Sequence, residues 1–128
     1  MTDSGNNPRS VKLTPDFWLG EFIMEADPMP APWVLDNLYR LAHRLQVVRD
    51  LLNRPVTVHS GYRTLLHNRE VGGYPNSYHL SGMAADIVVE GMAASDVQLF
   101  LKNWQGGLGS YPEFTHLDIR PYRARWRR

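Results

Sequence analysis

The chain of 128 residues contains no cysteine, so it has neither a disulfide framework nor a metal site built on thiolates. Any metal site must therefore use histidine, aspartate or glutamate side chains, and five histidines are present. No stretch approaches the ~20 apolar residues that cross a bilayer, so we expect no stable membrane insertion. The net charge of +1 gives no reason to expect nucleic acid as a partner.

The N-terminal segment also lacks the apolar core that a signal peptide requires. We therefore expect the protein to be made in the cytoplasm without a signal peptide, so that any action elsewhere depends on a separate means of release. Residues 1–12 are polar and are predicted to form a flexible N-terminal segment. Hydrophobic residues make up 43% of the chain, which is ordinary for a globular protein, and residues 13–128 suffice for one domain. We expect a monomer.

Hydrophobic periodicity predicts both helices and strands. Leucine and valine recur at three- and four-residue steps after Pro32, and Asn53 and Pro55 end that pattern, which predicts a long helix. Further helices are predicted over residues 64–71 and 93–104, and strands over residues 56–60, 84–89, 106–111 and 114–119. Connections of hairpin length between the later strands predict an α+β fold with a central antiparallel sheet flanked by helices.

Two short segments carry the residue types of a metal site. His79 and Asp86 lie among small residues, and His116 follows about thirty residues later, two positions before Asp118. Residues two apart in a strand share a face, so His116 and Asp118 are expected to point the same way. Two histidines and one carboxylate suit zinc and leave a fourth position open, as in catalytic sites. From spacing alone, structural histidines and solvated carboxylates at a hairpin end stay open as alternatives.

Three further side chains fit supporting roles around such a site. Glu113, at the mouth of the strand that carries His116, could act as general base and acid. Asp118 could hold His116 by its second ring nitrogen. Arg63 follows a Gly-Tyr turn, and its guanidinium fork could hold a substrate carboxylate or stabilise an oxyanion.

The block Ser77-x-His79-x-x-Gly82-x-Ala84-x-Asp86, followed by Glu113-x-x-His116, resembles the signature of the zinc D-Ala-D-Ala peptidase family. That family includes D-Ala-D-Ala carboxypeptidases, VanX-type dipeptidases and phage L-alanyl-D-glutamate endolysins, and Hedgehog signalling domains share its fold. The segments Ser60-Gly61-Tyr62-Arg63 and Gly106-Gly107-Leu108-Gly109 resemble further blocks of its small, single-domain branch. The resemblance covers roughly Leu13 to Trp126, within the predicted domain of residues 13–128.

The resemblance implies a role for each matching residue. One zinc ion would be held by His79, Asp86 and His116, with Glu113 as catalytic base and acid. Arg63 would bind and polarise the substrate, Ser77 would contact the substrate, and Asp118 would support His116 from behind. The implied substrate is the stem peptide of peptidoglycan, cut by an endopeptidase or a D-Ala-D-Ala carboxypeptidase. The implied setting is a phage or prophage endolysin that a holin releases to the cell wall.

Two other classes of function stay open. A non-catalytic zinc-binding module could share the fold, because fold does not establish activity. An iron enzyme could use two histidines and one carboxylate, although no histidine follows Asp118 to complete a triad that starts at His116. The C-terminal arginines are interpreted either as a solvated tail or as a basic segment attracted to an anionic cell wall; they are Arg120, Arg123, Arg125, Arg127 and Arg128.

Overall fold

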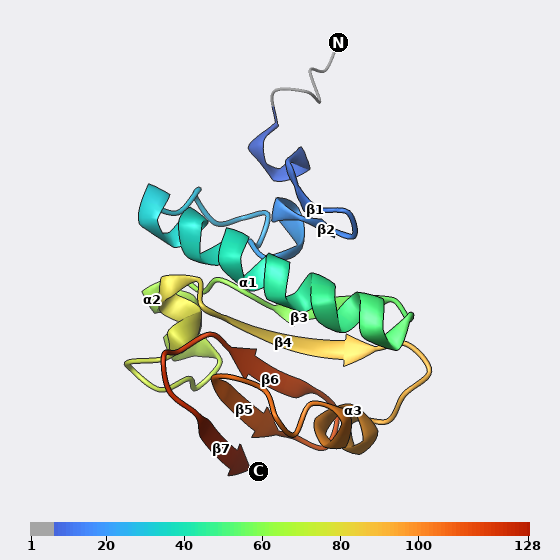
Figure 1. Ribbon diagram of the computed structural model, residues 1–128. Helices are drawn as coiled ribbons and strands as arrows, with labels where there is room; N and C mark the ends of the chain where they lie inside the picture. The colour runs from blue at the N-terminus through green and yellow to red at the C-terminus, as the bar shows by residue number, and fades with distance from the viewer. Residues whose placement is uncertain (1–6) are drawn as a thin grey trace.

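The computed structural model describes residues 7–128 and shows one small α+β fold, which confirms the predicted class (Figure 1). Its helices are η2 (Pro8–Ser10), η3 (Leu19–Glu21), α1 (Pro32–Leu52), α2 (Leu65–Glu70), η4 (Tyr78–Ser81) and α3 (Ala94–Phe100), where η denotes a 3-10 helix. Its strands are β1 (Lys12–Thr14), β2 (Phe17–Trp18), β3 (Val56–Ser60), β4 (Ala84–Val89), β5 (Gly107–Ser110), β6 (Thr115–Asp118) and β7 (Ala124–Arg127). None of the helices in this part of the chain has the length and apolar character needed to cross a bilayer.

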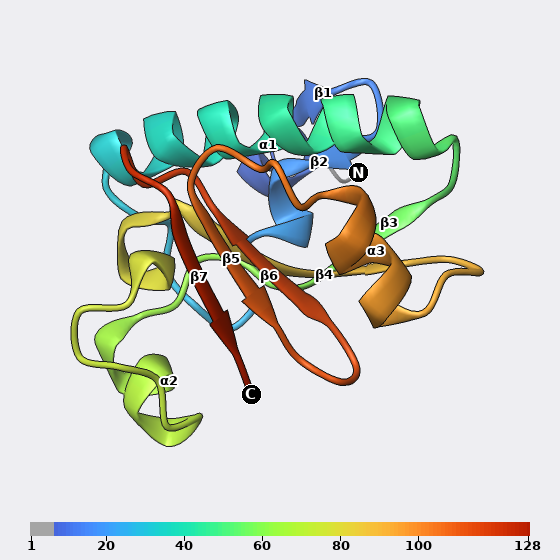
Figure 2. The ribbon, with the colours of Figure 1, turned by 60° about the horizontal axis from the view of Figure 1, so that its bottom comes forward.

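The main sheet has five strands in the order β3-β4-β6-β5-β7. The pairs β3–β4, β4–β6 and β5–β6 are antiparallel, as expected. The last pair differs, because β7 runs parallel to β5 and makes the sheet mixed. The chain leaves β6, crosses the end of β5 and returns along its far side, so that β7 forms the edge of the sheet in Figures 1 and 2.

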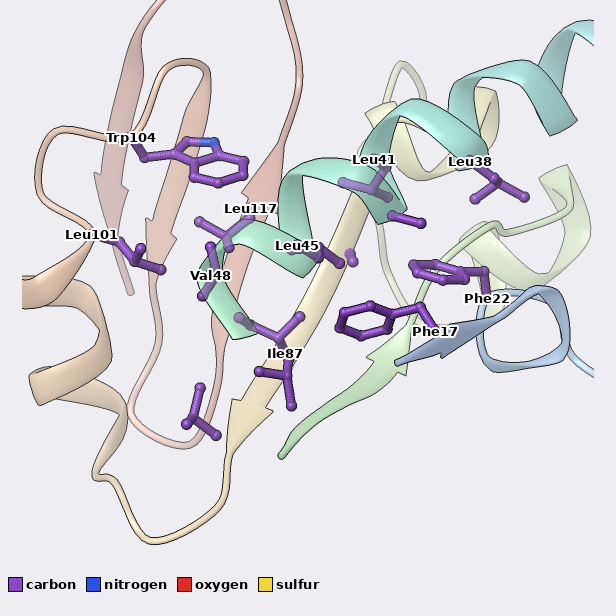
Figure 3. Packing of buried hydrophobic residues seen from close by; sticks show 14 of the residues in the cluster. Phe17, Phe22, Leu38, Leu41, Leu45, Val48, Ile87, Leu101, Trp104 and Leu117 are labelled. Carbon is purple, nitrogen blue, oxygen red and sulfur yellow. The ribbon is translucent and has the colours of Figure 1, made fainter. Parts of the chain in front are cut away.

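Helix α1 covers one face of the sheet and supplies much of the core. Pro32 at its first turn presets a helical φ, and Asn53 ends it in the left-handed conformation at φ 51°, with its N–H donating to the Arg49 carbonyl. Leu41 and Leu45 are fully buried on its inner face. In Figure 3 these leucines lie between Phe17 and Phe22 on one side and Leu117 and Trp104 on the other, so one continuous core joins the helix to the sheet.

The register of the strands places one row of residues across the opposite face. In order across the sheet they are Ser60, Asp86, His116, Gly109 and Trp126. Their sequence neighbours, such as Ala85, Ile87, Leu117 and Leu108, lie in the core beneath α1. Because side chains alternate along a strand, the row points away from the core.

The N-terminal part and the second long helix depart in detail from the sequence patterns. Residues 1–6 of the predicted flexible segment lie outside the described residues; within the remainder, Pro8–Ser10 forms a 3-10 turn and Lys12 begins β1. The helix expected over residues 93–104 ends at Phe100. The chain turns there, which brings the Trp104 indole N–H to the Asp118 carbonyl at 2.9 Å.

Candidate metal centre

Three elements bring together the three predicted metal ligands. His79 lies in η4, Asp86 in β4 and His116 in β6, and one ligand atom from each lies within 4.8 Å of the others. All three residues are buried. Asp86 and His116 are direct partners in the β4–β6 register, so the sheet itself sets their separation.

Both histidine rings are held by the nitrogen that faces away from the shared point. His79 Nδ1 lies 2.7 Å from the Gly61 carbonyl oxygen, and His116 Nε2 lies 2.8 Å from Asp118 Oδ2. The remaining nitrogens, His79 Nε2 and His116 Nδ1, lie 3.3 Å and 3.1 Å from Asp86 Oδ1. Two anchored imidazoles and a carboxylate with converging donor atoms are the set that zinc prefers, so the residues present fit the ion.

Asp86 and His116 shift each other's pKa through their contacts at this point. Burial alone would raise the pKa of Asp86, but hydrogen bonds from His116 and His79 outweigh it and hold that pKa well below its usual range. Burial would lower the pKa of His116, yet its hydrogen bonds to Asp118 and Asp86 dominate and raise it. The Asp86 carboxylate is therefore held in its charged form beside the two histidines.

Arg63 lies at the site, mainly as a partner of Asp86. Its Nη2 donates to Asp86 Oδ2 at 3.1 Å, its Nε donates to Ser60 Oγ at 3.0 Å, and its Nη1 donates to Asn68 Oδ1 at 3.3 Å. These contacts hold the second Asp86 oxygen and leave Oδ1 facing the histidines. Ser77 caps η4 by accepting the His79 N–H at 3.2 Å, and both Ser77 and Arg63 line the cleft described next.

The ligands open onto a cleft of about 970 Å³ with a largely aromatic lining. One wall is the segment between α2 and η4, which lies at the end of the sheet where β3 ends and β4 begins (Figure 1). Asn68 is fully buried and anchors this wall by donating to the Tyr74 carbonyl at 2.8 Å. The aromatic lining residues are Trp33, Tyr74, Tyr78, Tyr111, Phe114, Tyr122 and Trp126.

Another part of the lining comes from the C-terminal segment, which the sequence patterns did not assign to the site. Arg120, Tyr122 and Trp126 line the cleft, and the Trp126 ring lies 5.0 Å from the His116 ring. The interpretation of this segment as a solvated tail is wrong, because it forms β7. Two sequence signals were available: Arg120 continues the two-residue step of His116 and Asp118, and Trp126 alternates with arginines as strand residues do.

Glu113 is the predicted catalytic residue that the structure does not bring to the site. It is exposed in the turn between β5 and β6, and it is not among the residues that line the cleft. Its neighbours Tyr111 and Phe114 do line the cleft, with their rings stacked at 4.3 Å. Glu113 lies in the bend before β6, which begins at Thr115, so the alternation of side chains along the strand does not aim it at the His116 side of the sheet.

Comparisons with known proteins agree on one family. The family model described as peptidase M15 matches residues 20–118, which include all the ligand positions. The peptidoglycan L,D-endopeptidase MepK of Escherichia coli (strain K12) is 37% identical over 100 residues, which are 72% of this chain and 52% of that protein. The probable peptidoglycan L,D-endopeptidase MepK of Haemophilus influenzae is 31% identical over 96 residues, 69% of this chain and 52% of that protein.

A third relative matches a shorter stretch. The zinc D-Ala-D-Ala carboxypeptidase of Streptomyces albus G is 42% identical over 45 residues, 34% of this chain and 18% of that protein. The chain spans about half the length of the MepK relatives that it matches.

Proposed function

The chain belongs to the peptidase M15 family, and we propose that it is a zinc-dependent peptidase that cuts peptide bonds in the stem peptides of bacterial peptidoglycan. The observation that carries this proposal is the convergence of His79, Asp86 and His116 in the lining of a cleft. Each of the three side chains is fixed by a further contact on its other side. The names of the relatives support peptidoglycan as the substrate. The name of the shorter match supports zinc.

In this proposal, one zinc ion would be held by His79, His116 and Asp86, whose Nε2, Nδ1 and Oδ1 atoms converge. When bound, zinc supplies Lewis acidity, which polarises a peptide carbonyl and makes water a stronger nucleophile at neutral pH. The chain supplies the orientation. Arg63 holds Asp86 in place. Ser77 lines the cleft, where its hydroxyl can contact a bound peptide.

We propose an endopeptidase rather than a carboxypeptidase. Support comes from the two MepK relatives, which are named as L,D-endopeptidases and match most of this chain, whereas the carboxypeptidase matches about a third of it. A cleft of about 970 Å³ lined by aromatic rings has room for several residues of a peptide.

The experiment is digestion of purified sacculi by the zinc-loaded protein, followed by an amino-group assay and mass spectrometry of the released muropeptides. We expect new amino groups and cleaved cross-links, and no release by Asp86→Asn, which keeps the side-chain shape but removes its charge. Metal analysis of the same sample should show one zinc, not iron, per chain. A zinc-loaded native protein that releases nothing would overturn the proposal, and loss of terminal D-Ala alone would identify a carboxypeptidase.

For the biological setting we propose a phage or prophage lysin that reaches the wall through a holin. Its support is that the Ser77–Asp86 block resembles the signature of a family that includes phage endolysins. Co-expression with a holin should lyse the host cells, and the matching His116→Ala protein should not. Lysis that needs no holin would contradict this setting while leaving the peptidase activity in place.

A further inference from the structure

Asp118 is a fully buried carboxylate directly behind a metal ligand. Its oxygens accept hydrogen bonds from the backbone N–H groups of Gly107 at 2.9 Å and Arg120 at 3.2 Å. Its Oδ2 also faces His116 Nε2 at 2.8 Å. A buried carboxylate stays charged only when its partners compensate for the hydration that it has lost. The partners of Asp118 therefore decide how it holds His116.

The Arg120 side chain is the charged partner. Its Nε donates to Asp118 Oδ1 at 2.8 Å and its Nη2 donates to Asp118 Oδ2 at 2.7 Å, which is a bidentate pair. The Arg120 side chain is itself only 15% exposed. A guanidinium fork matches two carboxylate oxygens at once, whereas a lysine ammonium is a single point of charge.

Aromatic rings hold the guanidinium in that position. Its central carbon lies 4.5 Å from the centre of the Tyr78 ring, 5.2 Å from that of Trp126 and 5.6 Å from that of Tyr122. Tyr78 directly precedes the ligand His79, and the Trp126 ring packs on the ligand His116. Arg120 therefore touches the segments that carry both histidine ligands.

We propose that Arg120 is a positioning residue for the metal centre, acting through Asp118 to hold the ring of His116 and, by stacking on Tyr78, to join the two histidine-bearing segments. This inference rests on the proposed zinc site. Without the guanidinium, the buried Asp118 carboxylate loses its counter-charge, and His116 loses the fixed partner that directs Nδ1 toward Asp86.

The test measures zinc affinity by competition with a chromophoric chelator for the native protein, Arg120→Ala, Arg120→Lys and the control Arg127→Ala. Arg127 lies in the same C-terminal segment and is exposed, and its side chain makes no hydrogen bond within residues 7–128, so its removal subtracts the same charge without touching Asp118. We expect Arg120→Ala to bind zinc roughly 10–100-fold more weakly, the usual effect of losing an outer partner of a ligand. Arg120→Lys should fall between, and Arg127→Ala should match the native protein.

A second measurement separates positioning from general stability. The absorption spectrum of the cobalt-substituted protein reports ligand geometry, and it should change in Arg120→Ala and not in Arg127→Ala. Because Arg120 acts through Asp118, the double variant Asp118→Asn/Arg120→Ala should lose less than the product of the single losses. If Arg120→Ala does not fold, the same comparison is made with Arg120→Lys.

Native affinity and an unchanged cobalt spectrum in both Arg120 variants would overturn this inference while leaving the proposed function intact. Equal losses in Arg120→Ala and Arg127→Ala would also overturn it, because the effect would then be one of net charge. Absence of zinc binding by the native protein would instead overturn the proposed function, and the inference with it.

Discussion

Asp86 links the two sides of the candidate metal centre because its two oxygens have different partners. Oδ1 faces His79 and His116, whereas Oδ2 accepts a hydrogen bond from Arg63. The guanidinium thereby orients the carboxylate, so that the oxygen closest to the histidines is the one available to a cation. At the residue scale, Arg63 is bound mainly to protein groups, and its expected contact with substrate stays a prediction.

The proton-transfer role assigned to Glu113 is the residue-scale prediction that the geometry supports least. Its side chain is exposed and outside the cleft, so Glu113→Gln should retain peptidase activity within about threefold and bind zinc normally. Activity on sacculi and metal content, measured together, test this expectation. A loss of the ~10²–10⁴-fold size typical of general acid–base catalysis, with zinc still bound, would show that the turn brings Glu113 to the metal in the working enzyme.

The sequence could indicate the ligands because their signals are local. Small residues around His79 and Asp86, and the two-residue step from His116 to Asp118, are visible in the sequence itself. The step predicted a shared face, and the 2.8 Å contact between the two side chains confirms it. Local patterns can mark Arg120 and Trp126 as strand-like, but their place at the cleft depends on the long-range pairing of β7 with β5.

At the scale of elements, strand β5 has glycines at the positions where larger side chains of the neighbouring strands lie over it. Gly107 pairs with Asp118, and Gly109 pairs with both His116 and Trp126. A Cβ at position 107 would stand 2.3 Å from an Asp118 oxygen, and one at position 109 would stand 2.5 Å from the Trp126 ring. The two-residue spacing of these glycines therefore clears one face of the strand for the site.

Gly109→Ala should therefore destabilise the protein. The added methyl group would displace Trp126 from His116, and overpacking of this kind costs about 1–3 kcal/mol. Urea unfolding measures the change in the free energy of unfolding. Ser110→Ala, at the next position of the same strand, serves as the control and should stay within about 0.5 kcal/mol of the native protein. Equal stability of the two variants would contradict this account of β5.

The C-terminal segment shows why a high arginine content does not by itself predict a solvated tail. Its composition is rich in arginine, which favours a solvated interpretation, but two of these arginines serve as hydrogen-bond donors to backbone carbonyls. Arg123 donates to the Lys102 carbonyl, and Arg125 donates to those of Gly106 and Trp104, at 2.8, 2.8 and 2.6 Å. Carbonyl groups in the turn after α3 thus gain charged donors, which are stronger than neutral ones.

Arg125→Ala should lower the free energy of unfolding by about 1–2 kcal/mol, because charge-assisted hydrogen bonds to the 102–106 turn are lost from a partly solvated site. Arg127→Ala, two positions along the same strand, removes a side chain that makes no hydrogen bond within the described residues, and should change it by less than about 0.5 kcal/mol. Denaturant titration of both variants gives the comparison. Similar values for the two would mean that the arginines act through overall charge rather than through these bonds.

At the scale of the whole molecule, local periodicity predicts the individual helices and strands, but it does not predict how all the strands pair. The apolar face of α1, the alternation in β3 and the β-branched residues at the end of β4 are strong enough to predict these elements. The parallel placement of β7 on β5 depends on a chain reversal beyond β6, and its strand is short and polar. Tertiary pairing decides the structure of such a segment, so its propensity carries little information.

The candidate metal centre joins three elements that lie apart in the sequence, so metal binding there should stabilise the whole fold. An ion that binds only the folded chain adds about 2.7 kcal/mol at a free concentration one hundred times its dissociation constant. We therefore expect zinc to raise the melting temperature by on the order of 10 °C, measured by thermal unfolding with and without chelator. Mg²⁺, which prefers an octahedral shell of oxygens, should not do so.

Asp86→Asn is the matched control for this measurement, because it removes the charge that faces both histidines and keeps the shape of the side chain. Its melting temperature should be nearly the same with zinc and with chelator, whatever its value relative to the native protein. An equal rise in both proteins would locate zinc binding at another place, such as the exposed His43 or His59. If zinc does not raise the melting temperature of the native protein, this site does not bind zinc, because an ion that binds only the folded chain must stabilise it.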